Sequence, residues 1–281
     1  MTVTHPVGLG RPTLDDSAIA DSAARFVAAR RAAAGFDAFP GTLPPDLATA
    51  YAIQATATAA LGDAVAGWKI ARVPPALEER LGAGRFIGPV FAGTVVTADG
   101  AELSFPVVEG GFGAIEAEFV VRIAADTPAD KLDYTPAEAG AFIAAVHAGI
   151  EIAGSALSSV MTLGPTGSVS SFGNNTGLVI GGAVAGGVAA LDELRVETLI
   201  DGQSVGVGST ANVPGGIATA VAFALGMAAR LGRPLTAGQW LSTGALSGVH
   251  AITIGQQARV CFTGQEPLVG TAVAARPAAA G

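Results

Sequence analysis

Ile115–Ile123 reads IEAEFVVRI, in which apolar side chains occupy every second position. This alternation predicts a β-strand with one buried face. Glu116 and Glu118 lie on the same side of such a strand, with their Cα atoms roughly 6.5 to 7 Å apart. Two like charges at that separation repel each other, so they need water or a cation in front of them. The two glutamates therefore lie either on a solvated strand face or at a cation site.

Glu151 favours the cation site. It lies between Ile150 and Ile152, in a long apolar window that contains no other acid. An ionised carboxylate is costly there unless it is paired or ligated. Three carboxylates form a hard oxygen site that suits magnesium or manganese, whereas zinc more often recruits histidine or cysteine. A metal site shared by the three glutamates is thus one interpretation, beside the solvated strand face.

Short apolar and β-branched runs separated by Gly, Pro and Asp predict further strands. They lie at 95–97, 117–123, 178–180, 196–200, 205–207 and 259–262, with a hairpin turn at Asp201-Gly202. Helical periodicity predicts helices at 17–34, through 48–51, at 136–148 and at 217–231. The pattern indicates an α+β chain with an N-terminal helical segment (1–66), a β-rich catalytic core (67–275) and a short tail (276–281).

Composition narrows the class of protein. The chain has 281 residues, 50% of them hydrophobic, which is enough for a sizeable core without disulfides. Its mean hydropathy of +0.52 raises the question of a membrane span. The window 141–161 contains His147 and Glu151, and the window 217–229 is too short, so neither predicts a span. Abundant alanine and glycine are typical of a tightly packed core or a broad subunit interface, and we expect a homo-oligomer.

Charge and cysteine content exclude other classes. The net charge of −8 and only 15 scattered Lys and Arg residues disfavour nucleic acid as a partner but leave room for a small anionic substrate. The single cysteine, Cys261, excludes an intramolecular disulfide, and its apolar neighbours predict a buried thiol. No secretory signal is visible in residues 1–16, so we expect a cytoplasmic protein without a membrane partner. Sequence motifs of serine hydrolases, P-loop proteins and zincins are absent.

Two further segments contain polar side chains in apolar surroundings. Lys69 interrupts a strand-like stretch, where its amine either reaches solvent or balances carboxylates and moves a proton. Thr243 precedes Gly244, and a glycine there allows close backbone approach to a ligand. His147 and His250 lie among small residues, and ordinary structural roles are the better interpretation for both.

Several segments, taken in order, resemble a known family. They are Gly67–Ile70 (GWKI), Ile115–Glu118 (IEAE), Ile150–Ile152 (IEI), Asn174–Gly177 (NNTG) and Leu241–Leu246 (LSTGAL), the last preceded by Pro234–Gly238 (PLTAG). The set resembles the 2-oxopent-4-enoate hydratase and 4-oxalocrotonate decarboxylase family of the fumarylacetoacetate hydrolase superfamily. The resemblance covers about residues 51 to 273.

The resemblance implies a fumarylacetoacetate-hydrolase-like β-rich roll, a homo-oligomer, and Mg2+ or Mn2+ held by Glu116, Glu118 and Glu151. It implies that Lys69 is catalytic, and we expect substrate contacts from Lys69 together with Arg72, Thr243 and Gly244. The implied activity is that of a hydratase or decarboxylase of a 2-oxo-4-enoate type intermediate in aromatic catabolism. Such an enzyme works through a metal-stabilised enolate, and a paired pathway enzyme is a possible partner. A hydrolase or tautomerase of the superfamily, or a catalytically inactive metal-binding homologue, is the alternative.

Two departures from the family pattern concern the hydration step. Family hydratases usually carry acids in a Pro-Asp-Phe-Gly stretch and in a following Ala-Asp-Met. The corresponding segments here are Arg85–Gly88 (RFIG) and Ala92–Thr94 (AGT), in which both acids are missing. A family turn is also altered, to Asn212–Gly216 (NVPGG). We therefore expect a reshaped, more apolar substrate pocket, and hydration is in doubt.

Overall fold

The computed structural model describes residues 9–278, which form an α+β fold with two β-sheets. The strands are β1 (Val65–Arg72), β2 (Arg85–Phe91), β3 (Val95–Thr97), β4 (Leu103–Val107), β5 (Phe112–Ile123), β6 (Ile143–Ser155), β7 (Asn175–Ala183), β8 (Val196–Ile200), β9 (Gln203–Gly208), β10 (Trp240–Ser242), β11 (Val249–Ala251), β12 (Gln257–Phe262) and β13 (Leu268–Ala274). The helices are α1 (Asp16–Ala32), α2 (Leu47–Leu61), α3 (Pro75–Leu81), α4 (Pro136–Gly140), α5 (Val160–Leu163), α6 (Pro165–Ser170) and α7 (Gly216–Arg230), with four short 3-10 turns between them.

The larger sheet has eight strands and positions the site. Its order is β2-β1-β10-β5-β6-β7-β3, and β11 pairs with β5 beyond β10. The long strands β5 and β6 lie at its centre as an antiparallel pair. The short strand β10 runs parallel to β1 on one side and antiparallel to β5 on the other. This arrangement places β1, which carries Lys69, next to β10, although β10 follows α7 much later in the sequence.

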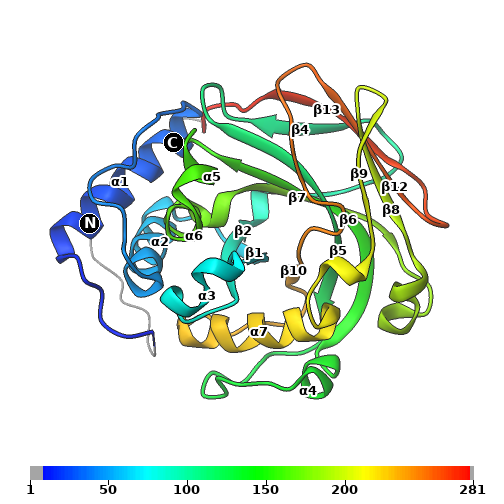
Figure 1. Cartoon of the computed structure of the whole chain (residues 1–281), viewed down its shortest axis with the longest axis horizontal. Coiled ribbons are helices and arrows are strands. Elements are labelled where there is room, and N and C mark those ends of the chain that lie inside the picture. The colour runs from blue at the N-terminus through cyan, green and yellow to red at the C-terminus, as the bar shows by residue number, and fades with distance from the viewer. Residues whose placement is uncertain (1–8, 279–281) are drawn as a thin grey trace.

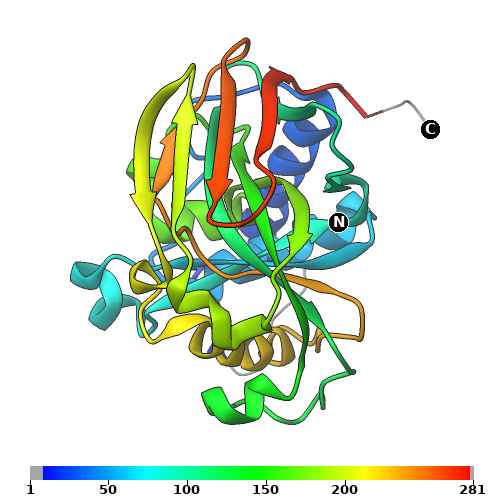
Figure 2. The ribbon, with the colours of Figure 1, turned by 90° about the vertical axis from the view of Figure 1, so that its right-hand side faces the viewer.

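The smaller sheet has the order β4-β13-β12-β8-β9, and its strands stand side by side in Figure 2. It covers the apolar face of β5. Phe119 on β5 packs against Phe262 on β12, with their ring centroids 5.6 Å apart. The odd-numbered residues of β5 thus face the core between the sheets, and Glu116 and Glu118 face the opposite way because side chains alternate along a strand.

The N-terminal helices form a layer at one side of the molecule (Figure 1). Asp15 caps α1 by accepting a hydrogen bond from the amide of Ala18 at 2.8 Å, and Asp46 caps α2 in the same way from Thr49 at 2.7 Å. The two helices pack on each other through a buried apolar cluster that includes Ile19 and Ile53. Helix α7 runs along another edge of the molecule (Figure 1).

Close contact between β1 and β10 requires a glycine. A Cβ atom at Gly67 would lie 2.1 Å from the carbonyl oxygen of Trp240, which no side chain permits. Gly67 therefore lets the parallel pair form, and Lys69 lies beside Ser242 in its register. The glycine of the GWKI segment thus serves the packing that places the lysine.

Most predicted elements are confirmed, including the helices near 17–34 and 217–231 and all six predicted strands. The hairpin at Asp201-Gly202 joins β8 to β9, and both residues have positive φ (50° and 76°), as a tight hairpin turn requires. The helix predicted at 136–148 is wrong. Only α4 (Pro136–Gly140) forms, and β6 begins at Ile143, because that alanine-rich segment pairs along its length with β5 and β7.

The window 141–161 is mostly strand β6, and no helix among residues 9–278 is long and apolar enough to cross a membrane. Cys261 lies on β12 and is partly exposed, so the buried thiol expected from its neighbours is wrong. The β-rich core begins with β1 at Val65. In the C-terminal tail, Ala278 donates to the carbonyl oxygen of Arg31 on α1 at 2.8 Å.

Candidate metal centre and its cavity

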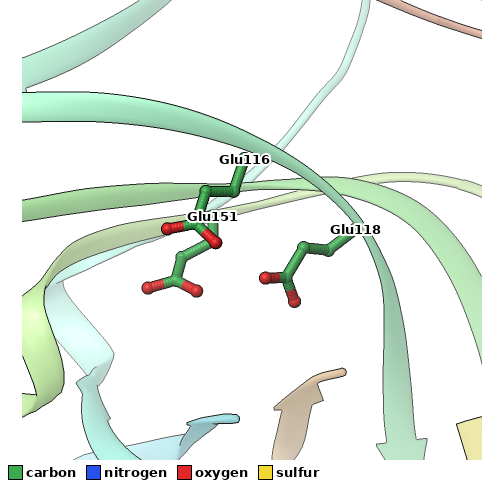
Figure 3. A group of neighbouring side chains, drawn as sticks. All are labelled: Glu116, Glu118 and Glu151. Carbon is green, nitrogen blue, oxygen red and sulfur yellow. The ribbon is translucent and has the colours of Figure 1, made fainter. Parts of the chain in front are cut away.

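Three glutamates converge in the middle of the larger sheet. Glu116 and Glu151 are directly opposite each other in the β5–β6 register, and Glu118 follows two residues along on the same face. One carboxylate oxygen from each lies within 4.8 Å of the others. In Figure 3 the carboxylates of Glu116 and Glu151 lie together, and Glu118 points toward them. The structure therefore brings together the three acids that the sequence singled out.

The cluster is buried and does not lie on an open strand face. Glu118 and Glu151 are 0% exposed and Glu116 is 6% exposed, so a solvated strand face is excluded. Burial raises the pKa of Glu116 to about 7, against the attraction of Lys69 and with help from Glu151. Burial, followed by repulsion from Glu151 and Glu116, raises the pKa of Glu118 well above its usual value. The pocket disfavours three negative charges unless positive charge lies beside them.

Lys69 supplies one such charge. Its ammonium lies 2.8 Å from a carboxylate oxygen of Glu151, and the side chain is 2% exposed. Burial by itself lowers the pKa of this lysine, but attraction to Glu151, Glu116 and Glu118 outweighs that effect and raises the pKa above its usual value. Lys69 is therefore a buried cation paired with the cluster, and not a lysine whose amine reaches solvent.

Neighbouring strands hold two of the carboxylates in place. One oxygen of Glu118 accepts hydrogen bonds from the Ser242 hydroxyl and from the Gly244 amide, the latter at 2.7 Å. One oxygen of Glu151 accepts from the side-chain amide of Asn175 at 3.1 Å. The other oxygen of Glu118 and the other oxygen of Glu151 are buried without a hydrogen-bond partner among the described residues.

This donor set fits a divalent metal ion. Two buried carboxylate oxygens without partners, next to a third carboxylate, carry more negative charge than Lys69 balances. Carboxylate oxygens are the ligands that Mg2+, Mn2+ and Ca2+ prefer. Glu116, Glu118 and Glu151 are the residues that would hold such an ion.

A cavity of about 440 Å3 opens beside the cluster. Its lining residues include Glu116, Lys69 and Thr243, together with the two arginines Arg72 and Arg85. Apolar residues such as Phe86 and Val213 also line it. A volume of this size suits a small organic molecule.

The predicted substrate contacts all lie in this cavity wall. Arg72 is exposed at the end of β1, whereas Thr243 is 1% exposed. The Thr243 hydroxyl donates to the carbonyl oxygen of Phe119 at 2.8 Å, so in this conformation it offers a ligand only an acceptor. The amide of Gly244 is engaged by Glu118, and the positive φ of 114° at this glycine allows that bend. Substrate contact by these residues stays a prediction.

Four residues at the site were not assigned a role from the sequence. Ser242 and Asn175 orient Glu118 and Glu151, and Arg85 and Asn174 line the cavity. Asn174 is 5% exposed and has a positive φ of 60°, and its side-chain oxygen has no hydrogen-bond partner within the described range 9–278. Asn174 and Asn175 belong to the NNTG segment, which was the available signal. Ser242 lies in the LSTGAL segment and Arg85 in the RFIG segment, but neither segment indicated a role for the residue, because strand pairing places both of them at the site.

The segments that depart from the family pattern also lie in the cavity wall, with one exception. Phe86 and the turn Asn212–Pro214 line it, whereas Ala92–Thr94 does not. His147 and His250 are not among the lining residues. Each hydrogen-bonds locally instead, to the carbonyl oxygens of Gly181 and Ser247 at 3.0 and 3.1 Å. Phe86 adds an apolar side chain to the wall, and the more apolar substrate pocket stays a prediction.

Comparison with known proteins identifies the fold. No protein-family profile matches the sequence, and no curated protein sequence is significantly similar to it. The structure is similar to 4-oxalocrotonate decarboxylase from Pseudomonas putida G7 complexed with magnesium and adipate, with a TM-score of 0.76 and 20% identity over 94% of this chain and 100% of that chain. The same enzyme complexed with calcium and acetate gives a TM-score of 0.75 and 21% identity over the same shares.

A more distant similarity extends to fumarylpyruvate hydrolase from Pseudomonas aeruginosa in complex with Mn2+ and pyruvate. Its TM-score is 0.53 and its identity 17%, over 74% of this chain and 88% of that chain. The match with the decarboxylase covers the whole of that enzyme's chain, whereas the match with the hydrolase leaves out about a quarter of the present chain. These similarities confirm the fold that the sequence motifs implied: the chain has the fold of the fumarylacetoacetate hydrolase superfamily.

Proposed function

We propose that the chain is a divalent-metal-dependent enzyme acting on a small 2-oxo acid, in which Lys69 handles a proton or negative charge at the 2-oxo group. The observation that carries this proposal is a pair of buried carboxylate oxygens, on Glu118 and Glu151, that have no hydrogen-bond partner among residues 9–278. They lie in a cluster with the buried ammonium of Lys69 and with Glu116, and these last two residues line a ligand-sized cavity. Perturbed, converging titratable groups in a cavity are typical of active sites.

A bound divalent cation polarises a carbonyl group and stabilises the negative charge that develops on its oxygen. The chain's own residues do the rest. Glu116, Glu118 and Glu151 would hold such an ion, and the ammonium of Lys69, 2.8 Å from a carboxylate oxygen of Glu151, could stabilise negative charge or donate a proton beside it. Phe86 contributes an apolar side chain to the cavity wall, and a lower local dielectric constant there would strengthen these interactions.

Two kinds of reaction fit this arrangement better than hydration. Decarboxylation and keto–enol proton transfer need an electron sink at the 2-oxo group and one proton donor, which an ion held by the three glutamates and the ammonium of Lys69 would supply. Hydration also needs a group that orients water, and Phe86 occupies the segment where family hydratases carry an acid. Glu116 is the one carboxylate among the described residues that line the cavity.

The structural neighbours support the choice of ligands. The Pseudomonas putida decarboxylase is complexed with magnesium or calcium, and the Pseudomonas aeruginosa hydrolase with Mn2+ and the 2-oxo acid pyruvate. These complexes support a divalent metal ion and a 2-oxo acid as the ligands of this chain. Because one neighbour is a hydrolase, hydrolysis is a second candidate reaction.

The test is metal-dependent enolisation, because it needs no knowledge of the natural substrate. In deuterium oxide with Mg2+, the protein should exchange the C3 protons of 2-oxobutanoate for deuterium, as followed by proton NMR. Glu118→Gln should abolish both Mg2+ binding by calorimetry and exchange. Glu266→Gln, at an exposed glutamate outside the site, is the matched control and should leave both Mg2+ binding and exchange unchanged. Metal binding without exchange would instead support the inactive metal-binding homologue.

A further inference from the structure

A second, smaller cavity lies beside the last turn of α1, and no described residue lines both this cavity and the larger one. Its volume is about 170 Å3. Its wall includes Phe26 and Arg30 of α1, Ser155 at the end of β6, Phe172 in the turn before β7, and Arg276 near the C-terminus. Cavities that hold drug-sized ligands measure about 300 to 1,000 Å3, so this one suits a ligand of only a few atoms.

Arg30 brings a partly buried positive charge to the smaller cavity. The central carbon of its guanidinium lies 4.8 Å from the ring centroid of Phe91 and 5.1 Å from that of Phe172. Burial lowers the pKa of Arg30 to about 10, and attraction to Asp63 opposes this shift. Arg30 forms no ion pair within 4 Å in the described part of the chain. Stacking on two rings thus holds the charge in place without neutralising it.

The wall of the smaller cavity favours an anion. One terminal nitrogen of Arg30 donates to the carbonyl oxygen of Asn175 at 2.9 Å, and a guanidinium has five N–H donors, so donors remain for a ligand. A second arginine, Arg276, lines the same cavity and is exposed. No acidic residue lines it within the range 9–278. Two positive charges therefore face a space that contains no negative charge from these residues.

The rest of the wall indicates the class of anion. Phe26, Pro106 and Val108 contribute apolar side chains. The hydroxyls of Ser155 and Ser171 hydrogen-bond to each other at 2.5 Å, which leaves the guanidinium as the main polar group. A guanidinium binds a carboxylate through two parallel hydrogen bonds. A carboxylate with a short apolar tail satisfies both parts of the wall, whereas a bare anion satisfies only one.

A strained turn, Phe172–Asn174, separates the two cavities. Phe172 lines the smaller cavity, and Gly173 and Asn174 line the larger one. All three residues have positive φ, of 53°, 70° and 60°. This conformation is costly for phenylalanine and asparagine, and such residues cluster at functional sites and switch segments. A ligand that packs against Phe172 therefore bears on the wall of the larger cavity.

Asn175, the next residue, connects the smaller cavity to the metal centre. Its carbonyl oxygen accepts the hydrogen bond from Arg30, and its side-chain amide donates to a carboxylate oxygen of Glu151 at 3.1 Å. One residue thus contacts both the cation of the smaller cavity and a candidate metal ligand. Asn175 is 0% exposed, so a shift in one contact has little room to leave the other unchanged.

We propose that the smaller cavity is a regulatory site, which binds a short-chain monocarboxylate at Arg30 and thereby raises the affinity of the three glutamates for a divalent metal ion. A negative charge beside Arg30 offsets its positive charge, and this favours a cation at the neighbouring carboxylates. The effect is reciprocal, because bound metal must raise the affinity for the carboxylate by the same factor. The proposal requires metal binding by the glutamates, as the proposed function does, but no particular reaction.

The experiment measures Mg2+ affinity of the full chain by calorimetry, with and without butanoate as the probe. Butanoate should raise the Mg2+ affinity of the parent about fivefold. Butanamide, which has the same shape without the charge, and formate, which has the charge without the tail, should each have a smaller effect. Butanoate should also bind to the metal-free protein, in which no ion can ligate it.

Variants assign the effect to Arg30. Arg30→Met should weaken binding of butanoate to the metal-free protein about tenfold or more and remove its effect on Mg2+ affinity, and Arg30→Lys, which retains the charge, should keep part of both. Arg25→Met is the matched control. Arg25 lies on the same helix, 5.2 Å from the ring centroid of Phe36, but it is exposed and does not line the cavity, so both measurements should stay unchanged.

Thermal unfolding checks that each variant is folded, and Arg276→Met, at an exposed position, provides a second variant that should reduce the effect of butanoate. An equal rise in Mg2+ affinity in the parent and in Arg30→Met would show that butanoate ligates the metal directly, and it overturns the regulatory site. No rise in the parent, or the same rise with butanamide, also overturns it and leaves the proposed function standing. If the parent does not bind Mg2+ under any of these conditions, both proposals fail.

Discussion

Lys69→Met should destabilise the metal-free protein strongly. A lysine whose amine reached solvent could be replaced with little loss of stability. Lys69 is instead the buried partner of Glu151, and its removal leaves ionised carboxylates without their counter-charge. Methionine keeps most of the apolar volume, so the change isolates the charge.

The magnitude follows from the geometry. Unit charges 2.8 Å apart attract by about 6 kcal/mol at an effective dielectric constant near 20. The cost of burying the lysine offsets part of this attraction, and the loss of one partner of a buried pair costs about 3 to 5 kcal/mol. We therefore expect the free energy of unfolding to fall by about 3 to 5 kcal/mol.

The chain offers a matched control. Lys131 pairs with Glu138, but both side chains are well exposed, at 37% and 46%. Exposed pairs contribute at most about 1 kcal/mol, so Lys131→Met should cost less than about 1 kcal/mol. Both variants and the parent are unfolded in urea at neutral pH with a metal chelator present.

A double-mutant cycle then assigns the effect. Adding Glu151→Gln to Lys69→Met removes the unpaired charge and should recover part of the lost stability, with a coupling free energy of about 1 to 3 kcal/mol. Saturating Mg2+ should narrow the difference between Lys69→Met and the parent, because the ion brings positive charge to the same carboxylates. A loss no larger than that of Lys131→Met would refute the reasoning, because the pair would then be neither buried nor stabilising.

Three further outcomes are expected. The melting temperature of the metal-free protein should fall as pH rises from about 5 to about 8. Burial raises the pKa of Glu116 from 4.5 to about 7 in the folded protein, so the folded form releases a proton in this range that the unfolded chain has already released, and the folded form is stabilised less as pH rises. A flat or rising melting temperature would contradict this. Ser242→Ala should weaken Mg2+ binding about tenfold or more in calorimetry, since it removes a donor that orients Glu118, whereas Ser104→Ala at an exposed serine on β4 should not. Light scattering should give a mass well above the 27.6 kDa of one chain, because we propose a homo-oligomer, and a monomer at micromolar concentration would contradict that.

The metal ligands were predictable because their signal is local. Alternation along Ile115–Ile123 places Glu116 and Glu118 on one face, and an acid between two isoleucines identifies Glu151. The register that brings Glu151 opposite Glu116 was not predictable, because it depends on pairing between distant strands. Strand β6, which carries Glu151, also shows the limit of local signals. The alanine-rich sequence at its start predicted a helix, but the strand forms there. Tertiary pairing decides such ambiguous sequences.

The rest of the site depends on contacts that no short window contains. Ser242 reaches Glu118 because β10 inserts between β1 and β5, although it follows α7 in the chain. Arg85 was noticed only as part of a segment that lacks an acid. Its proximity to Arg72 becomes visible once β1 and β2 are paired. Residues that act through strand register are therefore the part of this site that sequence patterns miss.

The opposition of Glu116 and Glu151 also bears on how the sheet assembles. A strand that slips by one residue turns its side chains to the other face. If β5 and β6 paired one residue out of register, Glu151 would leave the cluster and two of the three ligands would remain. A cation that binds the complete set stabilises the correctly paired sheet and not its slipped competitor. The ion would thus favour the native β5–β6 register during folding. Metal that stays bound in a purified sample would indicate that these two strands are paired in that register.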